Sequence, residues 1–405
     1  MDFKQAFSGI TVLAVARVVA APFAGYQLAM HGANVITIED PDGGDSQRNS
    51  GDLGTPFRNL HMGRTFLAYN SNKRSLTLGI NTPEGQEVFR KLVAKADVVI
   101  ENLKGGTMAR YGIGYEDLRK INKRIIFASV TGYGQTGPKQ NDPAIDGVIQ
   151  AVSGMMSITG TEHTGPLKTG STIIDYTTGY ATAFAIATAL FQRTQTGEGQ
   201  AIDVAMLETA VTMMSGEAVR AITGGGTPPL MGNGSGKGGY VSDTFACKEG
   251  FLAIAAGNAR RREKLWKVMG REDIPADPRF LTDELVRDNK TALDAEIIKT
   301  LSQKTADEWE IAMNKGGVAA MAVKPLHDAV HHPQLQSRKF FHAFPENAQP
   351  GLPAFQVPTA SYRMSANPMK MKSPPPLLGQ HTDEVLREFG FSGEEIVQLR
   401  AKGTV

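Results

Sequence analysis

Residues 10–39 read ITVLAVARVVAAPFAGYQLAMHGANVITIE, and this stretch decides the fold class. Residues 10–16 form a short apolar run, which is typical of a strand buried on both faces of a sheet. Pro22 suits the first turn of a helix, which we expect to end at Gly32. A second strand follows at residues 35–39. A strand, a helix and a strand in this order predict a parallel sheet covered by helices.

The same alternation continues through the first half of the chain. Thr82 and Pro83 suit the N-cap and the first position of another helix. Further elements that we expect are strands at 97–101, 125–130 and 200–204, helices at 115–122, 142–157 and 176–193, and a brief extended run at 172–174. The pattern predicts an α/β fold whose large domain holds a Rossmann-like parallel sheet.

The composition changes after this region, and 405 residues exceed what one ordinary core holds. We expect residues 1–205 to belong to the large domain. A linker with a glycine-rich segment follows at 206–239, and a smaller α+β domain at 240–330. Residues 331–405 then hold a proline-rich segment and two short helices, the second with a capping box of Ser392 and Glu395.

Composition excludes several classes of protein. Hydrophobic residues make up 41% and charged residues 21%, so the chain is not disordered, and a net charge of +2 gives no reason to expect a nucleic-acid partner. Cys247 is the one cysteine, which favours a reducing compartment, and we expect it to be a packed apolar side chain. The apolar residues 13–30 contain Arg17 and Pro22, so we interpret them as strand and helix rather than as a signal peptide or membrane span. The sequence predicts a cytoplasmic protein with no membrane partner.

Common cofactor and metal motifs are absent or incomplete. The turn at residues 16–22 has no glycine, so the dinucleotide fingerprint is missing although Glu39 resembles its ribose-binding acid. Lys237 follows glycines without the serine or threonine of a phosphate-binding loop. His327 and His331 have the spacing of zinc ligands but lack a third ligand nearby. We therefore predict no metal and no permanently bound cofactor, and keep a nicotinamide-dependent oxidoreductase only as a remote alternative.

Seven segments carry a resemblance that spans nearly the whole chain. They are GANVITIE at 32–39 with Gly44, Asp45 and Arg48 after it, NKRSL at 72–76, ADVVIEN at 96–102, GYGQ at 132–135, AVSG at 151–154, TGEGQ at 196–200 and PPLLGQHT at 375–382. In this order and spacing the chain resembles the family III CoA-transferases, or CaiB/BaiF family. This group contains formyl-CoA transferase, carnitine CoA-transferase and α-methylacyl-CoA racemase.

The resemblance implies an acyl-CoA:carboxylate CoA-transferase that acts on small carboxylic acids. Its nucleophile would be Asp175, passing through an aspartyl anhydride and an aspartyl-CoA thioester, with the CoA thioester as substrate. Without the resemblance, an aspartate before an apolar helix is more simply an N-cap. The two interpretations are compatible, since a helix N-terminus would keep the attacking carboxylate ionised.

The resemblance also implies where CoA would bind. Lys104 and Arg110 would hold its phosphates, with Lys73 and Arg74 as secondary candidates, although such residues are most often solvated surface. The remaining candidates are Val18, Val19, Asn102 and Leu103 along the adenosine and pantetheine path, and Tyr133 and Gly134 near the thioester.

The glycine-rich segment suits a lid that excludes water and donates to oxyanions, and Gly134 could also supply such a donor. Its candidate residues are Gly232, Gly234, Gly236, Gly238 and Gly239, and the alternative is a flexible linker between domains. The resemblance further implies that residues 331–405 return to complete the large domain. The partner would be a second copy of the chain, in an interlocked dimer of ring-like subunits.

Two positions depart from the family pattern. Asp40 stands where the family often has a basic residue near the adenine nucleotide. Ile145 stands where the racemases have a histidine base, before Asp146. Isoleucine cannot move a proton, which disfavours the alternative of an acyl-CoA racemase or epimerase. Asp175 likewise disfavours a non-catalytic acyl-CoA binder.

Overall fold

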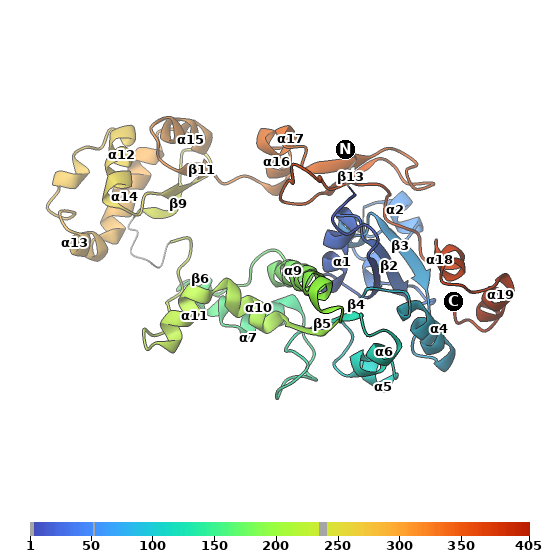
Figure 1. Ribbon diagram of the computed structural model, residues 1–405. Coiled ribbons are helices and arrows are strands. Elements are labelled where there is room, and N and C mark those ends of the chain that lie inside the picture. Colours follow the sequence, from blue (N-terminus) through green and yellow to red (C-terminus); the bar gives the residue numbers. More distant parts are fainter. Residues whose placement is uncertain (1–3, 52, 235–240) are drawn as a thin grey trace. The chain divides into compact units, whose positions relative to one another are not determined.

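The computed structural model describes residues 4–51, 53–234 and 241–405, which form two compact units (Figure 1). Unit 1 takes in the chain up to Ser153 together with Thr169–Ser215 and Gln334–Val405. Unit 2 takes in Gly154–Lys168 and Gly216–Pro333. Unlike the boundaries expected from the sequence, this division gives residues 154–168 to the second unit and residues 206–215 to the first.

Unit 1 is built on a six-stranded sheet whose strands all run parallel. The strand order is β3-β2-β1-β4-β5-β8. The strands are β1 Thr11–Val15, β2 Asn34–Glu39, β3 Lys73–Thr77, β4 Val98–Glu101, β5 Ile126–Thr131 and β8 Ala201–Ala205. The predicted α/β fold with a parallel sheet is confirmed.

Helices cover both faces of this sheet, and alternate residues of β1 enter different cores. Leu13 and Val15 join a core with the apolar faces of α4 (Pro83–Val93), α6 (Tyr115–Ile121), α18 (Thr382–Glu388) and α19 (Gly393–Ala401). Val12 and Ala14 join a second core with α1 (Ala20–Met30) and α9 (Ile173–Thr196). Burial on both sides explains why the first strand is almost wholly apolar.

The return of the C-terminal segment to unit 1 is fixed by specific contacts. The His381 N–H donates to Ser75 O at 2.9 Å, and Thr382 Oγ1 accepts from the Thr77 N–H at 3.1 Å. These contacts place α18 beside β3. The other elements of unit 1 are η1 Ser46–Asn49, α2 Thr55–Asn59, α3 Arg64–Tyr69, α5 Thr107–Arg110, α7 Asp146–Val152, α10 Met206–Met213, and the hairpin of β12 Phe341–Phe344 and β13 Phe355–Pro358.

Unit 2 is a smaller α+β unit with its own core. Its antiparallel sheet has the order β11-β10-β9, formed by Ala320–Ala322, Phe251–Ala255 and Ser242–Ala246. Trp266 and Trp309 are buried in its core. Its remaining elements, with α11 and α17 crossing the unit boundary, are α8 Met155–Ile158, β6 Gly160–Thr161, β7 Gly165–Pro166, α11 Ser215–Ile222, α12 Ala259–Met269, η2 Ile274–Ala276, α13 Asp283–Asp288, α14 Lys290–Leu301, α15 Ala306–Lys315, α16 Leu326–Val330 and α17 Pro333–Ser337.

Two local expectations from the sequence are wrong, and one strand was missed. Residues 173–174 are not extended, because α9 already begins at Ile173. The helix expected at 142–157 is two short helices, α7 and α8, divided at Gly154 with φ +86°. β3 was not expected at all. The predicted capping box of Ser392 and Glu395 is confirmed, and so is the predicted N-cap of α4, Thr82. In the described ranges, no helix is long and apolar enough to span a membrane.

Candidate active site

The strand order of unit 1 creates a natural binding crevice. β1 lies between β2 and β4, so the chain leaves β1 toward one side of the sheet and leaves β4 toward the other. Ligands of open α/β sheets bind at such a switch point, outside the carboxyl ends of the strands. The turn after β1 and the loop after β4 meet here, since Asn102 Oδ1 accepts from the Arg17 N–H at 2.8 Å.

A cavity of about 600 Å³ opens at this point, a size that suits a small-molecule ligand. The loops after β1, β4 and β5 line it, and so does Asp175 in the first turn of α9. The predicted site residues that the structure brings together around it are Val18, Val19, Asn102, Leu103, Lys104, Tyr133 and Asp175. Residues far apart in sequence therefore meet at one cavity.

Close helix packing places Asp175 beside the start of α1. Gly179 lies one turn after Asp175 on α9, and a Cβ atom there would lie 2.7 Å from Ala20 O. Only glycine allows this approach, because a real Cβ atom essentially never comes so near a backbone oxygen. The first turns of α1 and α9 are thereby held together at the cavity.

Asp175 is not the N-cap of α9, as one interpretation of the sequence held. It is the third residue of the helix, and Thr172 at the N-cap position makes no capping side-chain bond. The cap comes from Asp146 instead, whose Oδ2 accepts from the N–H groups of Ile174 at 2.8 Å and Asp175 at 3.1 Å. Gln150 Nε2 donates to the other oxygen, Asp146 Oδ1, at 2.5 Å. The Asp175 carboxylate is thus left free for chemistry.

The electrostatics of Asp175 differ from our expectation. The helix N-terminus was expected to keep its carboxylate ionised, but burial, and secondarily the charge of Asp146, raises the pKa of Asp175 to about 7. A carboxyl whose pKa lies near neutrality, in a cavity, is typical of a functional site. Among the described residues, no cation lies within ion-pair distance of it. Asp142 also lines the cavity, but its carboxylate pairs with Lys139 at 2.7 Å.

Two of the predicted phosphate ligands lie elsewhere. Lys73 is buried, and its ammonium donates to Pro22 O at 2.7 Å and Asn70 Oδ1 at 2.8 Å. Arg74 is held by Glu384 and Glu388 at 2.8 and 2.7 Å. Neither residue lines the cavity. Both side chains are already engaged within the protein, so the structure gives no support to a phosphate-binding role for them.

Arg110 and Gly134 also lie outside the cavity lining. Arg110 folds back on its own loop, where it donates to Thr107 Oγ1 at 2.7 Å. The Gly134 N–H donates to Thr131 Oγ1 at 2.9 Å. In unit 2, the Gly232 and Gly234 N–H groups donate to Gly160 O and Met231 O. These three N–H groups are committed in this conformation, while Gly236, Gly238 and Gly239 lie outside the described residues.

Known proteins resemble the chain along most of its length. The sequence model of CoA-transferase family III matches residues 7–382. The chain belongs to this family. The succinate–glutarate CoA-transferase of Agrobacterium fabrum is 34% identical over 398 residues, which cover 95% of this chain and 96% of that protein. The succinyl-CoA:glutarate CoA-transferase of Mus musculus is 33% identical over 409 residues, covering 100% and 91%.

A solved structure is also similar to the chain in its fold. The crystal structure of a CaiB/BaiF family protein from Brucella suis matches with a TM-score of 0.84 and 31% identity, over 96% of this chain and 100% of that one. The family III CoA-transferase assignment expected from the seven segments is therefore confirmed, and the protein is a CoA-transferase enzyme.

Sequence reasoning missed one cation of this family III CoA-transferase. Arg17 lines the cavity, and its guanidinium lies 3.5 Å from the Asp40 carboxylate. Asp40 is the position where the family pattern often has a basic residue. Arg17, from the turn after β1, places a positive charge beside this position. The available signal was a lone arginine inside an otherwise apolar turn, which we had used only to exclude a membrane span.

Ile145 and Asp146 bear on the racemase alternative. Ile145 lines the cavity, where it offers no group that could transfer a proton. The next residue, Asp146, is buried and occupied in capping α9. Among the described residues, no cluster of three or more histidine, cysteine or acidic side chains could hold a metal ion.

Proposed function

We propose that the enzyme transfers CoA between two small carboxylic acids through covalent intermediates on Asp175. The observation that carries this proposal is a partly buried carboxyl without a cation partner, with a pKa near 7, at the wall of a cavity of about 600 Å³. Once ionised, such a carboxylate is a nucleophile that is not neutralised by a neighbour. Lys104 and Arg17 supply positive charge in the same cavity lining.

The reaction would proceed in four attacks. The Asp175 carboxylate attacks the thioester carbonyl of the donor, the C–S bond breaks, and an aspartyl-acyl anhydride and CoA thiolate result. The thiolate attacks the aspartyl carbonyl, which releases the donor acid and forms an aspartyl-CoA thioester. The acceptor carboxylate attacks this thioester to give a second anhydride and thiolate. Attack of the thiolate on the acceptor carbonyl then releases the new acyl-CoA and restores Asp175.

The oxyanions of these steps need backbone donors, and we assign them to α1 rather than to Gly134. The first N–H groups of a helix have no acceptor within the helix. Val19 and Ala20, at the start of α1, line the cavity, and Gly179 holds this start against α9. Donors placed where negative charge develops stabilise the transition state. Val19 and Ala20 are thus well placed to serve Asp175.

The substrates that we propose are a C4 or C5 dicarboxylic acid and its CoA thioester. Relatives at 33–34% identity are named for succinate and glutarate. Lys104 and Arg17 would hold the CoA phosphates, because phosphates bind best to charged donors. Arg110 remains a candidate at the rim of the same loop, held there by Gly105 O and Thr107.

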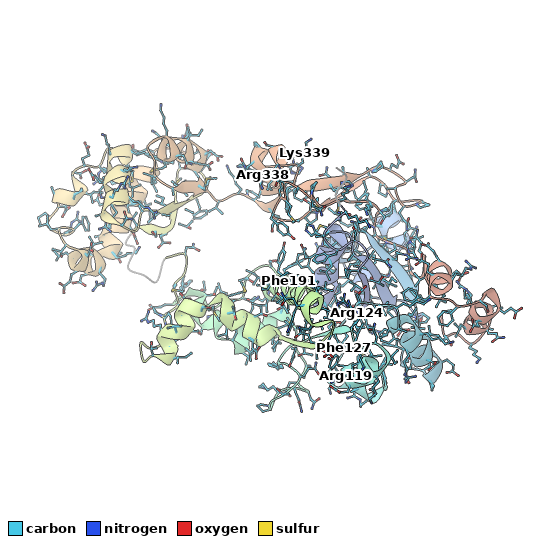
Figure 2. All side chains as sticks on the ribbon, in the orientation of Figure 1. Arg119, Arg124, Phe127, Phe191, Arg338 and Lys339 are labelled. Atoms are coloured by element: carbon cyan, nitrogen blue, oxygen red, sulfur yellow. The ribbon has the colours of Figure 1, made fainter. Side chains whose placement is uncertain are left out.

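We further propose that the active form is a homodimer. α9 presents Tyr180, Phe184 and Phe191 on one face, with Phe184 76% and Phe191 68% exposed (Figure 2 labels Phe191). Aromatic side chains spaced four and seven apart form a continuous stripe that a second chain could cover. Sedimentation should show a dimer at nanomolar concentration, and a folded, active monomer would contradict this proposal.

The transfer activity is tested by mass spectrometry. The purified enzyme is mixed with one acyl-CoA donor and a panel of carboxylic acids, and new CoA esters are identified by mass. The proposal predicts a new ester that grows as the donor falls, with succinyl-CoA and glutarate as the first pair to try. Release of free CoA without a new ester from any acid would contradict it.

A further inference from the structure

The turn between β1 and α1 holds a strained residue inside the cavity. Val18 has φ +69°, in the left-handed region, is 43% exposed and lines the cavity. A β-branched residue is a genuine outlier there, because its side chain crowds the backbone. Such a conformation persists only where the surroundings fix it, and it is most often found at functional sites.

Side chains from three other segments fix this turn through its backbone. The side-chain amide of Asn102 accepts from the Arg17 N–H at 2.8 Å and donates to Arg17 O at 2.7 Å. The Tyr69 hydroxyl donates to Val18 O. Asp45 Oδ1 accepts from the Val18 N–H at 3.4 Å. The polar backbone groups of both residues are therefore held from outside the turn.

The groups that hold the turn are themselves firmly placed. Tyr69 is fully buried, and burial, with the nearby charge of Asp45, raises the pKa of its phenol so that it stays a donor. Asp45 also accepts from the Gln47 N–H at 2.9 Å, and its own N–H donates to Glu39 Oε1 at 3.3 Å. Because Tyr69 has no exposed surface, it does not itself touch a ligand in the cavity.

We propose that Tyr69, Asp45 and Asn102 are positioning residues that hold Val18 in its strained conformation so that the turn can bind the CoA thioester. This inference rests on the proposed function. The left-handed residue sets the direction in which the chain leaves β1, and so where the first N–H groups of α1 point. Asn102 acts through the Arg17 backbone, because its Oδ1 accepts from the Arg17 N–H and its Nδ2 donates to Arg17 O.

The test is a rescue experiment with CoA itself as the ligand, measured by calorimetry. Tyr69→Phe removes the donor and keeps the ring, and should weaken CoA binding about tenfold, the value of one hydrogen bond. Adding Val18→Gly should return the affinity to within about threefold of wild type, because glycine adopts a positive φ without strain. Tyr26→Phe is the matched control. Tyr26 is also buried and donates to a backbone carbonyl at 2.8 Å, but that carbonyl belongs to Pro358, which does not line the cavity, and not to the turn.

The outcomes separate the two proposals. If wild-type protein binds CoA and Tyr69→Phe binds it equally well, the positioning role is wrong while the function stands. Failure of Val18→Gly to restore binding would likewise overturn it, since the loss would then not come from the turn. If wild-type protein does not bind CoA, the proposed function fails and this inference with it. Val18→Gly alone should unfold at or above the wild-type temperature, and a lower temperature would show that the turn is not strained.

Discussion

Glu39 is a buried acid of unit 1 and Asp175 a partly buried one, and their surroundings are opposite. Glu39, at the end of β2, receives Arg48 through two bonds of 2.7 and 2.8 Å and the Ser75 hydroxyl at 2.5 Å. Asp175 has another carboxylate, Asp146, as the neighbour that raises its pKa. A buried charge is costly unless it is paired. The fold therefore pairs Glu39 with a cation and leaves Asp175, which lines the cavity, without one.

The largest effect should come from Asp175→Asn, which keeps the shape of the side chain and removes the nucleophile. Transfer should fall below detection, as measured by formation of new acyl-CoA. Substantial turnover by this variant would contradict the assignment of Asp175.

The same variant should change the pH dependence of stability. The pKa of Asp175 is about 7 in the folded state and near 3.9 when unfolded, so the native state binds more protons between these values. The wild type therefore loses stability from this group as pH rises from about 4 to 7. Asp175→Asn escapes this loss, and its gain in melting temperature should be larger at pH 8 than at pH 5. An equal gain at both pH values would mean that the pKa of Asp175 is not raised.

Arg48→Ala should destabilise the protein, because it removes the cation that pairs with Glu39. It would leave Glu39 buried without a cation, which typically lowers the free energy of unfolding by about 3–5 kcal/mol. Arg48 also joins the C-terminal segment by donating to Pro376 O at 3.1 Å. The matched control is Arg119→Ala (Figure 2 labels Arg119), whose pair with Glu116 is exposed and should contribute at most about 1 kcal/mol. Equal destabilisation in urea denaturation would contradict the contrast.

Lys104→Ala should weaken CoA binding by about 1–3 kcal/mol, as expected for a lost charge-assisted hydrogen bond. Lys120→Ala provides the control, because Lys120 is an exposed lysine of α6 that pairs with Asp117 at 3.7 Å. Calorimetry with CoA measures both. Unchanged affinity in Lys104→Ala would show that the nucleotide does not lie along the loop after β4.

The smallest effect should come from Asp146→Asn, which keeps a capping oxygen but removes the charge next to Asp175. The pKa of Asp175 should fall toward its ordinary value. Because the carboxylate is the reactive form, activity rises with pH through this pKa, and the midpoint should move from near 7 to lower pH. Asp142→Asn should leave the midpoint in place. A midpoint that stays near 7 in Asp146→Asn would exclude a contribution from Asp146.

Much of unit 1 could be predicted from local sequence. The apolar run at β1, the caps of α4 and α19 and the alternation of elements each depend on neighbouring residues. β3 was missed because Lys73 and Arg74 make it look like surface. In the sheet, Lys73 instead points into the protein, where its ammonium meets Pro22 O and Asn70. Charge alone does not reveal burial, so the sequence did not indicate that Lys73 is engaged inside the protein.

Part of the cavity lining could be predicted from the sequence, but the electrostatics of Asp175 could not. The family resemblance led to Asp175, Lys104 and the loops after β1 and β4, which the structure gathers at one cavity. The pKa of Asp175 depends on burial and on Asp146, which lies 29 residues away and meets α9 only through folding. The strain at Val18 likewise depends on Tyr69, 51 residues away. Long-range contacts of this kind leave no local pattern.

The most direct test of the central claim is to trap the covalent intermediate. The enzyme is incubated with a donor acyl-CoA and hydroxylamine and then digested, and the masses of its peptides are measured by mass spectrometry. An activated aspartyl carbonyl reacts with hydroxylamine to give a hydroxamate, so the account predicts this mass change on the peptide that contains Asp175, and none without the donor. A label on a different carboxylate, or no label while transfer proceeds, would contradict the role of Asp175 as nucleophile.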